Sequence, residues 1–106
     1  MAIFSGKEEG GAKYGAPAML VLISLAEGEK HGYAVMQDIV GNMGVPIGPG
    51  TLYVAIGRLV RSGLVEALPS EERTRPYRIT EAGRQEVERF LSTWSSIVRL
   101  GKERMA

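Results

Sequence analysis

The sequence predicts a mainly α-helical domain with one small β-hairpin, and three observations support this fold class. The chain has 106 residues, about the length of a single domain, and its 44% hydrophobic and 24% charged residues suit a packed core. Apolar residues recur at helical spacing in several stretches. Two short apolar runs around a charged loop are typical of paired strands.

The first predicted helix occupies residues 17–26, after a flexible arm of residues 1–14 that carries glycines and charges without an apolar period. The helix is apolar at nearly every position; Pro17 stands at its start and Gly28 follows its end. Apolar residues on all sides indicate a helix buried all round. A buried strand is the alternative, but the length favours a helix.

A second, amphipathic helix is expected over residues 31–43. Met36, Ile39 and Met43 recur at intervals of three and four. Polar residues such as Asp38 fall on the other side, so one face of this helix should be buried and the other solvated.

A glycine- and proline-rich turn separates the second helix from a third. Residues 41–50 hold four glycines and two prolines. Pro49 suits the first position of a helix, and Gly63 suits the left-handed residue that ends one. We therefore expect the third helix to run from Pro49 to Ser62.

The pattern then changes to a hairpin and a last helix. Residues 64–68 and 76–79 read as strands around the charged loop 69–75. Thr80 suits an N-cap, and a long amphipathic helix follows from Glu81.

Three helices followed by a hairpin form the winged helix-turn-helix, in which the third helix enters the major groove of DNA. The predicted division is a flexible arm (1–14), a winged-helix DNA-binding domain (15–80) and a C-terminal dimerisation helix (81–106). The net charge of the whole chain is only +1, whereas residues 48–80 carry a net +2. Binding to DNA must therefore come from locally placed charge.

A helical wheel divides the third helix into an apolar and an outward face. The apolar face holds Leu52, Ala55, Ile56, Leu59 and Val60; the outward face holds Gly50, Val54, Gly57, Arg58 and Arg61. No acidic residue lies on the outward face. Arginines can read guanine or clamp phosphate, and Val54 can meet a thymine methyl group.

The chain resembles the PadR-like transcriptional regulators over about residues 18–90. The segments that carry the resemblance are Leu25-Ala26-Glu27-Gly28, His31-Gly32-Tyr33, Pro49-Gly50-Thr51-Leu52-Tyr53, Arg58-Leu59, Gly63-Leu64-Val65 and Tyr77-Arg78-Ile79-Thr80-Glu81-Ala82-Gly83. The resemblance implies a homodimer, a palindromic operator and usually repression. It also implies contacts with double-stranded DNA from Tyr33, Pro49, Thr51, Tyr53 and the wing, which is the predicted hairpin of residues 64–79. We expect no cofactor.

Three positions depart from the family pattern. Gly48 stands where a capping serine is frequent, Val54 replaces a frequent proline and Val60 replaces a frequent acidic residue. Glycine is a tolerable cap, so the first change should cost only a few tenths of a kcal/mol. Val54 points outward and should alter the base preference. None of the three changes the predicted fold.

The predicted DNA-binding set unites the third helix, the helix starts and the wing. It consists of Tyr33, Pro49, Gly50, Thr51, Tyr53, Val54, Arg58, Arg61, Arg73, Arg75 and Arg78. Two members have competing interpretations. Tyr33 lies at the edge of an apolar stripe and could be partly packed, and the wing arginines could form only a solvated hairpin tip beside Glu71 and Glu72.

The last helix carries more apolar residues than a core of this size can cover. The predicted dimerisation residues are Val87, Phe90, Leu91, Trp94, Ile97 and Val98, in part at coiled-coil spacing. A second copy of the chain is the expected partner. In some family members a tryptophan at this place stacks on flat aromatic effectors, so the resemblance makes Trp94 a candidate effector contact. Simple packing of the interface is the favoured alternative.

Several function classes are disfavoured. The chain has no cysteine and one histidine, which leaves no metal cluster, nucleophile–base pair or other recognisable catalytic site, so an enzyme is the weakest hypothesis. His31 is expected to form a local hydrogen bond near a helix start. No segment is long and apolar enough to span a membrane, and we expect a cytoplasmic protein. The alternative to DNA binding is a winged helix that contacts a partner protein through Val54 and the wing.

Overall fold

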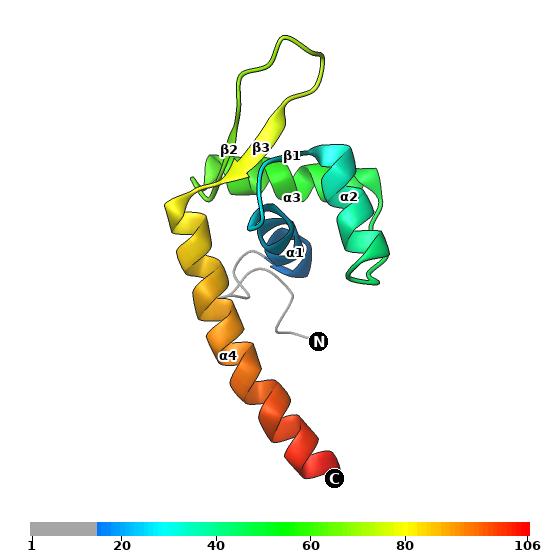
Figure 1. The fold of residues 1–106 in the computed structure, drawn as a ribbon, viewed down its shortest axis with the longest axis vertical. Coiled ribbons are helices and arrows are strands. Elements are labelled where there is room, and N and C mark those ends of the chain that lie inside the picture. Colours follow the sequence, from blue (N-terminus) through cyan, green and yellow to red (C-terminus); the bar gives the residue numbers. More distant parts are fainter. Residues whose placement is uncertain (1–14) are drawn as a thin grey trace.

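The computed structural model describes residues 15–106, so the expected arm of residues 1–14 lies outside the described part. The elements follow in the order α1 (Gly15–Leu25), β1 (Lys30–His31), α2 (Gly32–Gly41), α3 (Pro49–Arg61), β2 (Val65–Ala67), β3 (Pro76–Ile79) and α4 (Glu81–Met105) (Figure 1). This order confirms the predicted winged helix, with boundaries that differ by one or two residues at most helix ends.

Helix α1 is the centre of the core. It packs against α2, α3, α4 and β3, and seven of its eleven residues are buried. Met19, Leu22 and Leu25 are among the largest buried side chains in the described residues. The other four residues are partly buried and none is exposed, so the prediction of a helix buried all round is confirmed.

The sheet has three strands in the order β1-β3-β2, whereas the sequence predicts only the β2–β3 hairpin. Strand β1 pairs antiparallel with β3 through Lys30 opposite Tyr77 and His31 opposite Pro76. Two residues are too few to show the alternating pattern of a strand, so only the tertiary pairing identifies β1.

The predicted ends of α3 and the start of α4 are confirmed by their backbone geometry. Gly63 follows α3 with a φ of +79°, the left-handed conformation that glycine adopts readily. Thr80 Oγ1 accepts a hydrogen bond from the Gly83 N–H at 3.1 Å and donates one to the Gly63 carbonyl at 2.7 Å. Thr80 thus caps α4 and ties it to the end of α3.

Polar contacts fix α2 against α1. The buried Ser24 hydroxyl donates a hydrogen bond to Asp38 Oδ2 at 2.7 Å, and the Asn42 amide donates one to Asp38 Oδ1 at 2.8 Å. The Lys30 ammonium lies 3.7 Å from Asp38 Oδ2 and also donates to the Ser24 carbonyl. These contacts, led by the Asn42 hydrogen bond and then that of Ser24, hold the pKa of Asp38 below its ordinary value.

The wing and the far end of α4 point in opposite directions from the three-helix core (Figure 1). Of the residues of α4, only Gly83 and Val87 are buried, so the helix leaves the core after its first turns. The molecule is elongated and extends over 53 × 26 × 23 Å along its three principal axes. Among residues 15–106, no helix is both long and apolar enough to cross a membrane.

Candidate nucleic-acid interface

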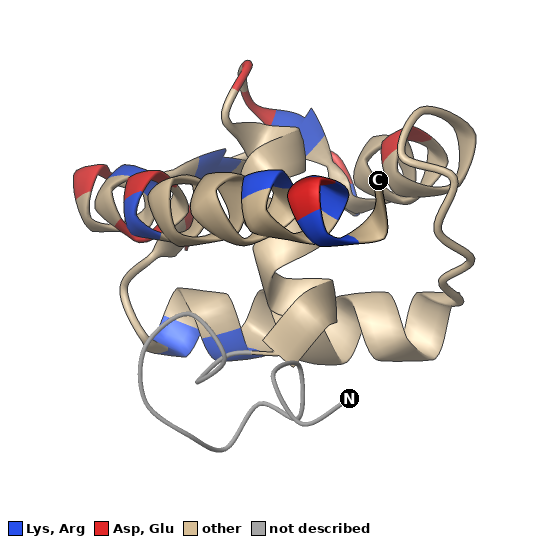
Figure 2. Ribbon diagram, turned by 90° about the horizontal axis from the view of Figure 1, so that it is seen from below, with Lys and Arg blue, Asp and Glu red and all other residues tan. Residues whose placement is uncertain are grey.

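Helix α3 presents the outward face that the sequence predicts. Leu52, Ala55, Ile56 and Leu59 are buried, while Gly50, Val54, Arg58 and Arg61 are exposed; Gly57 and Val60 are partly buried. The exposed fraction of Val54 is 64%. Figure 2, in which α3 lies along the lower edge, shows basic residues near its C-terminal end and no acidic residue. A solvated helix face usually mixes both charges, so this face is suited to an anionic partner.

The start of α3 leaves backbone donors open. Gly48 is the N-cap in an extended conformation and supplies no side-chain hydrogen bond, and Pro49 occupies the first turn. Thr51 and Tyr53 are exposed on the same first turns. Free N–H groups and hydroxyls at a helix N-terminus are suited to phosphate oxygens.

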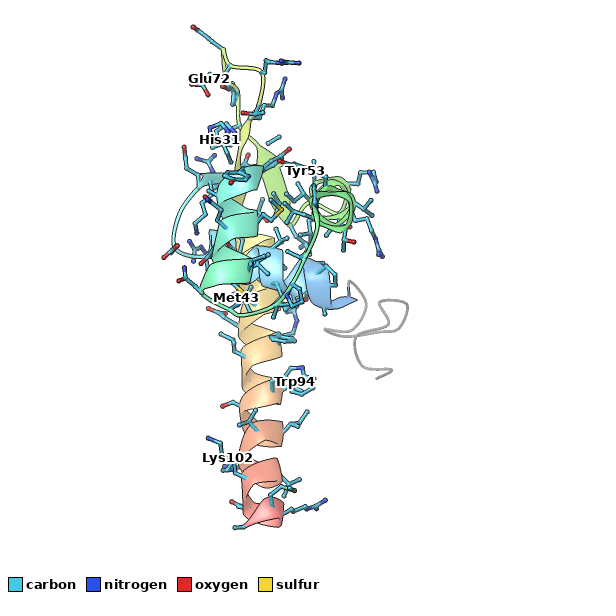
Figure 3. The ribbon with its side chains drawn as sticks, turned by 90° about the vertical axis from the view of Figure 1, so that its right-hand side faces the viewer. His31, Met43, Tyr53, Glu72, Trp94 and Lys102 are labelled. Carbon is cyan, nitrogen blue, oxygen red and sulfur yellow. The ribbon has the colours of Figure 1, made fainter. Side chains whose placement is uncertain are left out.

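A pocket joins the start of α3 to the wing. Its volume is about 310 Å³, and its lining residues are Gly32, Tyr53, Arg73, Thr74, Arg75 and Tyr77. Tyr53 lies between the core and the wing (Figure 3). The structure thus brings three predicted DNA-binding residues, Tyr53, Arg73 and Arg75, to one place.

Sequence reasoning missed Gly32 as part of this pocket. A Cβ atom on Gly32 would stand 2.7 Å from Tyr53 Cζ, which is closer than real Cβ contacts allow. Gly32 therefore leaves the space that the Tyr53 ring occupies. The only signal in the sequence is the His31-Gly32-Tyr33 segment, which does not reveal the contact.

His31 does not form the expected local hydrogen bond. Its Nδ1 atom lies 3.1 Å from Thr74 Oγ1, and its Nε2 atom lies 4.0 Å from Glu72 Oε1. Both partners belong to the loop of the wing. They are within reach because the pairing of β1 with β3 places His31 at the base of the wing (Figure 3). His31 thus links the start of α2 to the wing.

The predicted cluster of three wing arginines is divided by the structure. Arg78 Nη2 lies 3.0 Å from Glu66 Oε2, its cross-strand neighbour in the β2–β3 register. Side chains alternate along β3, so Arg78 lies on the opposite face of the hairpin from the buried Ile79. Arg73 and Arg75, which line the pocket, are better placed than Arg78 for an anionic ligand.

Tyr33 is 62% exposed at the start of α2, so it is not packed in the core. Its ring borders a shallow groove of about 360 Å³, which is lined by Tyr33, Met36, Gln37, Val40, Gly41 and Ile47. The structure therefore leaves Tyr33 accessible, as a phosphate contact requires.

Helix α4 carries an exposed apolar face beyond the core. Leu91, Ile97 and Val98 are exposed, and the Trp94 ring lies 6.0 Å from that of Phe90 between centroids, at a tilt of 42°. Phe90 also packs partly against the core. Leu100 and Met105 extend the apolar exposure, although sequence reasoning did not include them.

Val87 needs a correction within this set. Its side chain is 7% exposed and belongs to the core of its own chain, because the first turns of α4 pack against α1 and β3. Helical periodicity alone places Val87 on the same face of α4 as Leu91. In the structure, however, Val87 is not accessible to a second copy of the chain.

Most of the chain matches a known protein family in sequence. The sequence profile of the family described as "Transcriptional regulator PadR-like family" matches residues 21–89. A 37.1 kDa protein in transposon TN4556 of Streptomyces fradiae is 46% identical over 71 residues, which are 67% of this chain. The chain spans only 21% of the length of that relative.

Solved structures share the fold. A transcriptional regulator from Clostridium thermocellum is 27% identical, with a TM-score of 0.72 over 82% of this chain and 87% of that one. A PadR family transcription regulator from Clostridium difficile is 21% identical, with a TM-score of 0.78 over 87% of this chain and 100% of that one. Bacillus subtilis PadR in complex with operator DNA is 20% identical, with a TM-score of 0.62 over 70% of this chain and 45% of that one.

Proposed function

Because this chain belongs to the PadR-like family of transcriptional regulators, we propose that it binds double-stranded DNA sequence-specifically through α3 and the wing. The main support for this proposal is the outward face of α3, which is free of acidic residues and exposes Arg58, Arg61 and Val54. Arginines on such a helix read guanine or hold phosphate, and a small apolar side chain reads a thymine methyl group.

The other residues of the interface position the protein on the duplex. Tyr33, Pro49, Gly50, Thr51 and Tyr53 lie at the starts of α2 and α3, where hydroxyls and backbone N–H groups can meet phosphates. Arg73 and Arg75 would contact the backbone or the minor groove from the wing. Arg78 contributes less, because Glu66 partly neutralises its charge.

We further propose that the chain acts as a homodimer on a palindromic operator and represses transcription. The exposed apolar face of α4 supports the dimer, since a lone solvated helix seldom keeps such a face. Two helix-turn-helix units of a dimer read half-sites about 34 Å apart, one turn of DNA. Such a regulator would act in the cytoplasm.

The test is binding to a duplex selected from a random pool, compared with a scrambled duplex. Arg58→Ala and Arg61→Ala should each weaken selective binding by about 1–3 kcal/mol where the side chain reads a base, or lower the salt dependence where it meets phosphate. Arg99→Ala, on α4 away from this face, is the control. Unchanged binding in both α3 variants would contradict the proposed face, and negligible binding to any duplex at low salt would favour a protein-interaction module.

Trp94 is a second proposed contact, toward a small aromatic effector. It is partly buried on the proposed dimer face, where a planar molecule could stack between two copies. Quenching of its fluorescence by planar cationic compounds would support this role. No response across a panel would leave packing of the dimer as its function.

A further inference from the structure

The Arg61 guanidinium lies over Gly57 on the outward face of α3, and this position distinguishes the two arginines of the helix. Arg61 Nη1 lies 3.3 Å from the position that a Cβ atom would take on Gly57. The Arg61 side chain therefore folds back along the helix by one turn, in the direction in which helical side chains lean. The residue one turn before Arg58 is Val54, which has a side chain at the corresponding place.

The separation indicates that a side chain at residue 57 would disturb this position of the guanidinium. A distance of 3.3 Å is tighter than an ordinary van der Waals contact, so with a methyl group at residue 57 the Arg61 guanidinium would have to shift by a few tenths of an ångström. The guanidinium is the far end of a flexible side chain, so it can move without disturbing the fold. A substitution at Gly57 should thus displace Arg61 and leave α3 intact.

The folded-back position places the charge of Arg61 toward the middle of α3. A guanidinium that extends past the end of a recognition helix meets phosphates at the groove edge, whereas one that lies against its outward face meets base edges on the groove floor. A bidentate contact with guanine also requires the guanidinium fork to be placed accurately.

We propose that Gly57 is a positioning residue that sets the base preference read by Arg61. This inference rests on the proposed DNA-binding function and adds to it the residue that separates the role of Arg61 from that of Arg58. It predicts a preference for guanine at one position of each half-site, which depends on both residues of the pair.

The experiment compares the duplexes selected by the full-length wild type, Gly57→Ala, Arg61→Ala and the double variant. Gly57→Ala should lose the guanine preference at the same position as Arg61→Ala, with about a 10-fold loss of affinity for the wild-type site. In the double variant, Gly57→Ala should add little to the effect of Arg61→Ala, because both changes remove one interaction. Gly41→Ala, where a Cβ would meet nothing within 4 Å, is the matched glycine control.

The outcomes separate this inference from the function on which it rests. Selective binding by the wild type, with Gly57→Ala unchanged or with additive effects in the double variant, would overturn the positioning role alone. A wild type that selects no sequence would overturn the proposed function as well. Circular dichroism of Gly57→Ala confirms that altered binding does not come from unfolding.

Discussion

At the scale of single residues, glycines decide how closely elements of this protein approach one another. Gly83 lies in the first turn of α4, where an added Cβ would clash with the Leu64 carbonyl oxygen and stand 2.7 Å from Ile79 Cγ1. Neither neighbour can move cheaply, because Leu64 O is backbone and Ile79 is buried. The glycine therefore allows α4 to pack at the base of the wing.

Gly83→Ala should lower the free energy of unfolding by about 1–3 kcal/mol, because an added methyl group overpacks this contact. Urea unfolding followed by circular dichroism measures the change. Gly41→Ala, at an open helical position, should be neutral or stabilising by up to about 1 kcal/mol. Equal stability of the two variants would show that the packing around Gly83 is not restrictive.

At the scale of elements, the Asp38 carboxylate couples α2 to α1 through a set of hydrogen bonds. The lowered pKa of Asp38 has a direct consequence for stability. A carboxyl group with a lower pKa in the folded state stabilises that state above its unfolded pKa, about 3.9, and this contribution is lost as the pH falls through the folded pKa.

Asp38→Asn should therefore destabilise the protein by about 1 kcal/mol at pH 7, because charge-assisted hydrogen bonds are lost. The difference from the wild type should shrink as the pH falls below about 4, since only the wild type must then protonate residue 38. Unfolding by urea at pH 7 and pH 3 measures both differences. Glu71→Gln, on the exposed wing, is the control and should not lower the stability at pH 7. If the stability difference between Asp38→Asn and the wild type were the same at both pH values, the carboxylate of Asp38 would not stabilise the contact between α1 and α2.

At the scale of the whole molecule, the two proposed tasks, DNA binding near the wing and dimerisation along α4, are separated along the long axis. Helix α4 has 25 residues, a length of about 37 Å, and only its first turns are covered by the core. The rest of α4, which carries the exposed Leu91, Ile97 and Val98, extends to the end of the molecule opposite the wing (Figure 1). A second copy can thus pair along α4 without covering the outward face of α3.

Val98→Asp should convert the proposed dimer to a monomer, because it places a charge in the centre of the apolar face far from the core. Ser96→Asp is the matched control, since residue 96 lies on the opposite side of the helix. Sedimentation velocity measures the state of association, and circular dichroism confirms folding. A dimeric Val98→Asp variant would contradict the proposed interface, as would a stable, dimeric, DNA-binding chain truncated at Ser92.

Local patterns were sufficient to predict the helices, the hairpin and the two faces of α3. The spacing of Leu52, Ile56 and Leu59 fixes which side of α3 is buried, because the geometry of one helix relates these positions without reference to the rest of the chain. The same geometry leaves Arg58 and Arg61 on the outward side. The candidate site on α3 is therefore largely a property of the sequence.

The tertiary structure alone decided which elements meet. It pairs β1 with β3, turns His31 toward the wing, places Arg78 against Glu66 and buries Val87 in its own chain. These contacts join positions in different elements, and their distances depend on how whole helices and strands pack. A periodic pattern describes one element at a time, so it does not carry that information.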